Sequence, residues 1–267
     1  MHQTQPQKSP IRTEVKGPVG YLIFDRPERK NALSFNMWRE VPKLLAALAE
    51  NKEVRAIVLR GAGDLPFCSG ADISEFETVR ASADGARTYE EANIVAFDAI
   101  GSCPVPTIAM IRSFCMGGGV GLAAACDLRV ASDNAEFAIP PGRLGLAYPP
   151  QAIGYIVACI GAPNAKDWLY TARRVKAPEA EKLGFLNRLV ADAALESEVE
   201  ALAATIADNA PLSLRAGKLA INHAAGFEAA ASLEAVLAAA EKCFDSADYK
   251  EGRAAFLGKR KPVFRGE

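Results

Sequence analysis

The chain has 267 residues, half of them apolar, which is enough to bury the core of one large domain. Its 31 basic and 32 acidic side chains nearly cancel. Such a balance produces no field that would gather nucleic acid or an anionic membrane surface, so neither is expected as a partner.

Six cysteines are scattered without a CxxC pair, and the first residues, MHQTQPQKSPIRTEV, lack the apolar run of a secretory signal. We therefore expect a cytoplasmic protein with free thiols. The uncharged stretch 144–165 is long enough to raise the question of a membrane span, but it contains several prolines and glycines. We expect it to form a buried loop and a helix.

Over the first two thirds of the chain, short apolar runs alternate with helical patterns, which predicts βα units. Patterns typical of strands occur at residues 19–27, 55–63, 107–115 and 127–132. Helical spacing follows Ser34 and covers residues 88–100, and Pro42 is expected to kink or shorten the first helix. Several strand segments are apolar on both faces, as in a sheet that is covered on each side.

From about residue 195 the sequence changes to Ala-rich helical segments divided by Pro211, Gly226 and Asp248, with no strand candidate. Helices of this kind cannot bury all their apolar faces alone. We expect them to pack on the core or on a neighbouring subunit, and we therefore expect a homo-oligomer.

Two glycine-containing turns each follow a strand pattern and precede a helical one. In SFCMGGGVGLAAACDL, three consecutive glycines (117–119) remove every side chain at the junction. Backbone N–H groups could there approach a ligand at the positive end of a helix dipole. In GAGDLPFCSGADISEF, the small residues 69–71 stand at a similar junction, with Asp72 placed to cap the following helix.

One glycine-rich turn alone is equally consistent with a tight turn or close helix packing, but two such turns favour a binding site. Gly119, Gly121 and Ala124 satisfy the dinucleotide motif GxGxxA, although no acidic residue ends a second strand in the expected βαβ context. The sequence contains no GK followed by Ser or Thr, which excludes a P-loop.

Five segments in order resemble the enoyl-CoA hydratase/isomerase (crotonase) family, and together they cover nearly the whole chain. They are RPERKNALS, GAGDLPFCSGADISEF, VPTIAMIRSFCMGGGVGLAAACDLRVASDNAEFAIPPGRLGL, KAPEAEKLGFLNRLV and KEGRAAFLGKRKPVF. The resemblance implies an α/β fold: a spiral of ββα turns over residues 1–194, followed by a C-terminal helical oligomerisation region over residues 195–267. It also implies a trimer or a dimer of trimers.

The resemblance further implies that an acyl-CoA thioester carbonyl lies between the backbone N–H groups of Ala71 and Gly118, which stabilise an enolate-like oxyanion. Losing one such donor typically costs about 3 kcal/mol in the transition state. Residues that match CoA- and substrate-binding positions are Lys30, Asn31, Ala32, Leu33, Asp72, Ile73, Ser74 and Gly117, with Phe256 and Lys259 commonly reaching a neighbouring subunit's CoA. The alternative for the GKRK segment is a solvated tail.

The well-known hydratases of this family transfer protons through two glutamates, whose positions match Gly121 and Pro141 here. A third position, an aspartate in certain isomerases and dehalogenases of the family, matches Pro149. None of these side chains can transfer a proton, so the ordinary hydratase mechanism is not expected.

Tyr148 resembles a tyrosine of the family's methylmalonyl-CoA decarboxylases, where loss of carbon dioxide creates the enolate directly. The alternative is a pocket-lining aromatic whose hydroxyl is satisfied by backbone. Arg143 could hold a substrate carboxylate or form a structural salt bridge. Cys68 has no histidine nearby, so we interpret it as packing, and the isolated His2 and His223 support neither a triad nor a metal site.

We therefore predict a cytoplasmic, oligomeric lyase that acts on an acyl-CoA thioester, either an atypical enoyl-CoA hydratase or a decarboxylase-like enzyme. Ala71, Gly118 and Tyr148 are its predicted catalytic residues. CoA is part of the substrate, and no further cofactor or metal is expected. The alternatives are a non-catalytic acyl-CoA-binding homologue and an enoyl-CoA isomerase.

Overall fold

The main sheet has six strands in the order β1-β2-β3-β4-β6-β9 in the computed structural model, which describes residues 9–227 and 230–267. Only the β1–β2 pair is antiparallel; the other neighbours are parallel. The strands are β1 (Ile11–Lys16), β2 (Val19–Phe24), β3 (Ala56–Gly61), β4 (Thr107–Ile111), β6 (Leu128–Ser132) and β9 (Arg188–Val190). A second sheet contains β5 (Phe114–Met116), β7 (Glu136–Ala138) and β8 (Val175–Lys176).

Three strands of the main sheet, β3, β4 and β6, each lead toward a helix, and two of them do so through a short strand of the second sheet. β4 continues through β5 into α4 (Gly118–Ala125), and β6 continues through β7 toward α5 (Pro150–Thr171). After β3, a single bridge between Cys68 and Cys115 takes the place of a short strand before α2 (Phe76–Val79) and α3 (Ala83–Gly101). This repetition confirms the predicted spiral of ββα turns.

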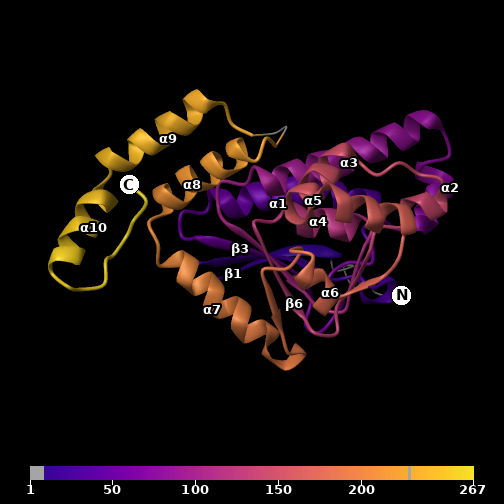
Figure 1. Cartoon of the computed structure of the whole chain (residues 1–267), viewed down its shortest axis with the longest axis horizontal. Coiled ribbons are helices and arrows are strands. Elements are labelled where there is room, and N and C mark those ends of the chain that lie inside the picture. The colour runs from indigo at the N-terminus through magenta and orange to yellow at the C-terminus, as the bar shows by residue number, and fades with distance from the viewer. Residues whose placement is uncertain (1–8, 228–229) are drawn as a thin grey trace, which may run out of the picture.

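The helices cover both faces of the main sheet (Figure 1): α1 (Phe35–Glu50), α3, α4 and α5 lie on one side and α7 (Leu195–Ala207) on the other. The strands are therefore apolar on both faces, as predicted. In β2, Leu22 and Phe24 contribute to the core under α1, whereas Tyr21 and Ile23 contribute to the core under α7.

The first helix begins where the sequence predicts it, because the Ser34 side chain accepts a hydrogen bond from the Met37 N–H and caps it. It continues without interruption through Pro42 to Glu50. The expected shortening is therefore wrong: the helix buries one apolar face along its length, including Trp38 and Leu45, and this packing outweighs the missing N–H. A helix interrupted by non-helical backbone is α5, where Gly161 has φ 73°.

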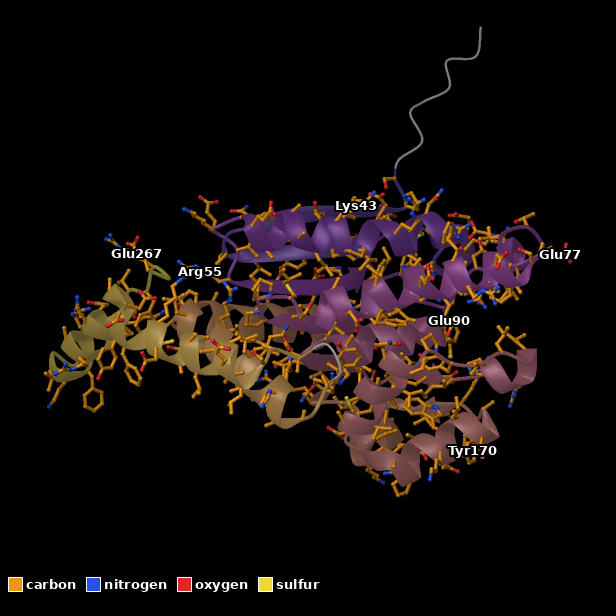
Figure 2. The ribbon with its side chains drawn as sticks, turned by 90° about the horizontal axis from the view of Figure 1, so that it is seen from above. Lys43, Arg55, Glu77, Glu90, Tyr170 and Glu267 are labelled. Atoms are coloured by element: carbon orange, nitrogen blue, oxygen red, sulfur yellow. The ribbon has the colours of Figure 1, made fainter. Side chains whose placement is uncertain are left out.

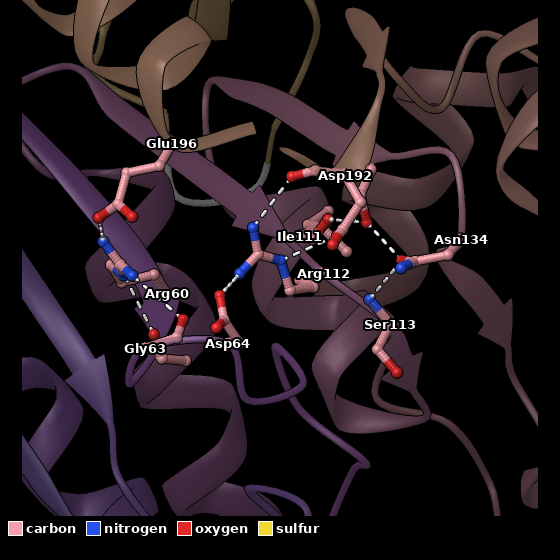
Figure 3. A network of polar contacts seen from close by, with 11 residues as sticks. Arg60, Gly63, Asp64, Ile111, Arg112, Ser113, Asn134, Asp192 and Glu196 are labelled. Atoms are coloured by element: carbon pink, nitrogen blue, oxygen red, sulfur yellow. Dashed lines mark hydrogen bonds and ion pairs between the residues drawn. The ribbon is translucent and has the colours of Figure 1, made fainter. Parts of the chain in front are cut away.

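The predicted strand at 107–115 is two strands. Ser113 has φ 57°, and the chain turns there from β4 in the main sheet into β5 in the second. Arg112 lies at this turn, where its guanidinium contacts Asp64 and Asp192, while the neighbouring Arg60 contacts Glu196 (Figure 3). These ion pairs join the ends of two strands to the start of α7.

The C-terminal region is helical, as predicted, with α7, α8 (Pro211–Ala224), α9 (Leu233–Asp245) and α10 (Ala247–Leu257). The predicted boundary at residue 195 precedes α7, which packs on the sheet through Leu195, Val199 and Leu202. The helices that extend beyond the core are α8, α9 and α10, and Glu267 lies at that end of the molecule with Glu77 at the other (Figure 2).

Asp248 does not break the last helical segment. The boundary is at Ser246, which caps α10 by accepting the Tyr249 N–H at 3.0 Å, and Asp248 lies in the first turn. An acidic side chain is favoured there by the helix dipole. Its buried carboxylate accepts the N–H groups of Arg265 and Gly266 and so holds the end of the chain against α10.

The remaining elements are α6 (Ala177–Lys182) and four short 3-10 turns, at Pro27–Arg29, Ile73–Glu75, Pro141–Leu144 and Asp192–Ala194. The segment 144–165 forms a loop with an exposed Leu144 and then α5, whose Ile156 and Ile160 are buried. In the described part of the chain, no helix combines the length and apolar character needed to cross a membrane.

Candidate active site

The two glycine-containing turns lie against each other. The Cys68 N–H donates to the Phe114 carbonyl at 3.0 Å, and the Met116 N–H donates to the Cys68 carbonyl at 2.9 Å. Gly70 has φ 101°, and a Cβ at that position would lie 2.9 Å from the Met116 carbonyl oxygen. A side chain would therefore separate the turns, which explains the glycine.

Each turn presents one free amide next to the other. A Cβ built on Gly118 would lie 3.9 Å from the Ala71 nitrogen, so the two residues are neighbours across the junction. Within residues 9–227 and 230–267, neither the Ala71 nor the Gly118 N–H donates to another protein group. The Gly118 N–H is at the N-terminal end of α4, where the helix dipole favours negative charge.

Both peptides are fixed from their carbonyl side. The Gly70 carbonyl, in the peptide that carries the Ala71 N–H, accepts the Leu33 N–H at 2.8 Å. The Gly117 carbonyl, in the peptide that carries the Gly118 N–H, accepts the Val120 N–H at 2.9 Å and the Tyr148 hydroxyl at 2.8 Å. The arrangement is a pair of rigid donors that have no acceptor among the described residues.

An aromatic wall that the sequence analysis did not identify supports the second turn. The Trp38 ring would lie 2.7 Å from a Cβ at Gly118 and packs edge-to-face on Phe97 at 5.5 Å. Its indole N–H donates to the Tyr89 hydroxyl at 3.1 Å. In the sequence these residues are ordinary members of apolar helix faces, so nothing distinguishes them from other core residues.

The position of the first missing glutamate is physically occupied. A Cβ at Gly121 would lie 2.7 Å from the Phe97 ring and 3.1 Å from the Tyr148 hydroxyl oxygen. Pro141 and Pro149 are both buried, and each begins a helical turn. The fold therefore leaves no space for a side chain at 121 and uses the other two positions to form backbone turns.

The first two carboxylates that follow the first turn in the sequence are engaged in the fold. Glu75 accepts the Phe35 N–H at 2.7 Å and so caps α1. Asp72 caps the Ile73–Glu75 turn through the Ser74 N–H, as predicted, and pairs with Arg26 at 2.7 Å. Burial opposes its ionisation, but the hydrogen bonds from Ser74 and Arg26 outweigh burial and hold the pKa of Asp72 below its usual value.

The segment matched to CoA contacts contains both exposed and structural side chains. The Lys30 ammonium is exposed and lies 5.0 Å from the centre of the Phe114 ring, while Ile73 and Ser74 are also exposed. Asn31 is buried and donates to the Pro66 carbonyl at 2.6 Å. Ala32 and Leu33 are buried, and with Asp72 they form the interior of the segment. Only its exposed side chains are free to contact a ligand directly.

Three other predicted residues lie apart from the two turns or make no contact with them. Arg143 is exposed and forms no ion pair with any described residue. Phe256 is 84% exposed on α10, and Lys259 follows this helix with φ 50°. Figure 1 shows α10 at the far end of the molecule from α4, so one chain does not bring these two side chains to the turns.

Burial favours the protonated forms of the Cys68 thiol and the Tyr148 hydroxyl. Burial raises the pKa of the Cys68 thiol to about 12, and its sulfur accepts the Gly70 N–H at 3.3 Å, which agrees with a packing role. Burial also raises the pKa of the Tyr148 hydroxyl well above its usual value. The described residues contain no cluster of three or more His, Cys, Asp or Glu side chains suited to a metal.

The ββα spiral with two glycine-containing turns at its strand-to-helix junctions defines a crotonase-type fold. The chain belongs to the enoyl-CoA hydratase/isomerase family, whose model matches residues 14–267. A short-chain-enoyl-CoA hydratase of Clostridium acetobutylicum is 32% identical over 93% of this chain and 94% of its own length. A Delta(3,5)-Delta(2,4)-dienoyl-CoA isomerase of Arabidopsis thaliana is 31% identical over 95% of each chain. The structure of an enoyl-CoA hydratase/carnithine racemase from Magnetospirillum magneticum superimposes with a TM-score of 0.91, at 35% identity over 97% of this chain and 96% of that one.

Proposed function

We propose that the protein is a lyase that acts on an acyl-CoA thioester by holding an enolate oxygen between the N–H groups of Ala71 and Gly118. The observation that carries the proposal is the pair of adjacent amides, fixed on their carbonyl sides and unbonded on their N–H sides. Donors that are oriented in advance stabilise developing negative charge without reorganisation, which is the largest single contribution in many acyl-transfer and enolate-forming enzymes.

Among the described residues, positions 121 and 141 have no carboxylate and Glu75 and Asp72 are engaged in the fold, which favours a reaction that forms the enolate without a carboxylate base. Phe97 and the Tyr148 hydroxyl fill the space beside Gly121, and Glu75 and Asp72 are bonded within the fold. Loss of carbon dioxide breaks the bond between the α-carbon and the carboxylate of a malonyl-type thioester and leaves the electron pair on the α-carbon. The two amides stabilise it as the enolate, and a proton from solvent water then completes the acyl-CoA product. The proposal also includes an atypical enoyl-CoA hydratase, because two relatives that are 32% and 33% identical are named as a short-chain-enoyl-CoA hydratase and a crotonyl-CoA hydratase.

A second feature supports a carboxylate-bearing acyl group. The Arg80 guanidinium lies 4.2 Å from the centre of the Tyr89 ring and 4.6 Å from that of Phe76. Burial lowers the pKa of Arg80, and its Nε is buried without an acceptor among the described residues. The Tyr89 hydroxyl accepts the Trp38 indole N–H, and the Trp38 ring packs on Gly118. Two side chains, Tyr89 and Trp38, thus lie between the Arg80 guanidinium and the proposed oxyanion site.

CoA itself enters this proposal only as part of the substrate, held by the exposed side chains of the first turn. We further propose a cytoplasmic homo-oligomer in which Phe256 and Lys259 serve the CoA of a neighbouring copy. Their exposure on helices that extend from the core supports this arrangement.

The test is to incubate the purified protein with crotonyl-CoA, a longer enoyl-CoA, methylmalonyl-CoA and ethylmalonyl-CoA and to identify products by mass spectrometry. Carbon dioxide loss from a malonyl-type thioester is the expected result. Hydration of crotonyl-CoA at an ordinary rate would contradict the argument from Gly121 and Pro141. Thioester binding without turnover across the panel would indicate an acyl-CoA-binding homologue, and movement of the double bond would indicate an isomerase.

A further inference from the structure

The second free amide belongs to the peptide between Gly117 and Gly118. The described chain contains no cis peptide, so the carbonyl oxygen and the N–H of this unit lie in one plane and point in opposite directions. The carbonyl accepts the Tyr148 hydroxyl at 2.8 Å. A donor on the carbonyl side therefore acts on the N–H without contacting the ligand that the N–H binds.

We propose that Tyr148 is a positioning residue: its hydroxyl fixes and polarises the Gly117–Gly118 peptide so that the N–H presents a stronger donor to the thioester oxygen, and it does not transfer a proton itself. This inference rests on the proposed function. The hydroxyl has one proton, which is already donated to the Gly117 carbonyl. Burial also disfavours its loss by raising the pKa of the hydroxyl.

The backbone at this junction needs such a restraint. Gly117 has φ 49° and ψ −119°, and neither it nor Gly118 has a side chain to limit rotation of the peptide between them. The Gly117 carbonyl accepts the Val120 N–H at 2.9 Å, the Gly121 N–H at 3.4 Å and the Tyr148 hydroxyl at 2.8 Å, and the hydroxyl is the only side-chain donor of the three. A hydrogen bond to a peptide carbonyl also strengthens the bond that its N–H donates, by about 10–30% per bond.

The two donors differ in how they are fixed. The Gly70 carbonyl, behind the Ala71 N–H, is held by the backbone of Leu33, whereas the carbonyl behind the Gly118 N–H is held partly by a side chain. The Tyr148 hydroxyl reaches that carbonyl past Gly121, where a Cβ would lie only 3.1 Å from the hydroxyl oxygen. The glycine that removes a potential acid thus also gives Tyr148 access to the peptide.

The experiment compares the parent protein with Tyr148→Phe, using butyryl-CoA isotopically labelled at its thioester carbonyl as an unreactive probe. Infrared difference spectroscopy measures how far binding lowers the carbonyl stretching frequency, which reports the strength of the two donors. The matched control is Tyr155→Phe, because Tyr155 is also buried but packs on Phe227 instead of either turn. Melting temperatures check that each variant is folded.

We expect binding to lower the carbonyl frequency in the parent and in Tyr155→Phe, and the shift to shrink by about 10–30% in Tyr148→Phe. With a thioester that the parent converts, kcat should fall in Tyr148→Phe, with KM within twofold and the shape of the pH profile retained. An undiminished shift in folded Tyr148→Phe, or a pH profile that loses one limb, would overturn the positioning role. No shift in the parent would instead refute the proposed oxyanion site and the inference with it.

Discussion

At the scale of single residues, glycine 121 shows how packing decides chemistry. The position matches a catalytic glutamate in the family's hydratases, yet here the Phe97 ring and the Tyr148 hydroxyl occupy the space into which any side chain would project. The sequence could show that the acid is missing, because that needs only the residue type. It could not show what fills the space, because Phe97 is separated from Gly121 by two elements of the fold and has no distinguishing motif.

Gly121→Ala should lower the free energy of unfolding by about 1–3 kcal/mol, because its methyl group would lie 2.7 Å from the Phe97 ring. Replacing the ring by the smaller side chain in Phe97→Leu makes room for the methyl group. The double variant should therefore lose less free energy of unfolding than the sum of the losses of the two single variants. Urea unfolding of the four proteins measures this coupling. Gly154→Ala is the control: this helical position has no atom within 4 Å of a new Cβ, so the change should be neutral or stabilising. Strict additivity would contradict the proposed contact.

Asp72 makes the first turn sensitive to acid. Its pKa is lowered in the folded protein, so its contribution to stability is fully present above the unfolded value of about 3.9 and is lost as the pH falls through the lower folded value. Asp72→Asn should therefore reduce stability at neutral pH and weaken its dependence on pH in the acid range. Urea unfolding at a series of pH values from about 7 down to below the unfolded value of about 3.9 tests this. Asp84→Asn, at an exposed surface pair, should leave the profile unchanged.

At the scale of elements, the sequence predicted β2, β3, β4, β6 and the long helices because their apolar periodicity extends over several turns or pleats. It did not predict β1, whose six residues are mostly half-buried or exposed and contain no continuous apolar run. The second sheet was not predicted as a separate sheet, since its strands have only two or three residues and no period can be read from them. The same limit hid the break at Ser113 between β4 and β5. These short strands are stabilised by contacts between segments far apart in the sequence, such as the backbone β-bridge between Cys68 and Cys115. Contacts of this kind leave no pattern in the local sequence.

Arg112 stabilises the turn between β4 and β5 through its ion pairs (Figure 3). It pairs with Asp64 and Asp192 and donates to the Asp192 carbonyl at 3.1 Å. Arg112→Met should lower the free energy of unfolding by about 1–2 kcal/mol, since the arginine side chain is 12% exposed while its partner Asp192 is half-buried and its partner Asp64 is exposed. Arg87→Met, which removes an exposed pair on α3, should cost less than about 0.5 kcal/mol. Equal effects in urea unfolding would show that burial of Arg112 adds nothing.

At the scale of the whole molecule, the apolar surface of α8–α10 is the feature that one chain leaves incomplete. Leu233, Leu237 and Phe244 recur at helical spacing on α9, and all three are more than half exposed. Contiguous apolar surface of this kind marks an interaction site. The sequence predicted that these helices need a partner, although the first helix of the region, α7, finds it in the chain's own sheet.

Leu237→Glu should therefore dissociate the proposed oligomer, because a buried charge without a partner is costly at an interface. Sedimentation equilibrium or light scattering of the purified variant measures its mass. Tyr170→Glu is the matched control: Tyr170 is 75% exposed on α5, at a site in Figure 2 remote from α9. A parent protein that sediments as a single chain, or an unchanged mass in Leu237→Glu, would contradict this use of the surface.

The proposed donors belong to the main chain, and this bears on how such a protein can diverge. Every amino acid except proline supplies the same N–H, so an exchange at position 71 alters the shape of the site while the donor persists. The acids and bases around the two donors can therefore change during evolution, and a new reaction can arise while the site still stabilises an enolate. Position 118 does not allow such an exchange, because the Trp38 ring leaves no space there for a side chain. We therefore expect Gly118 to be retained together with Trp38 while other residues around the two donors change.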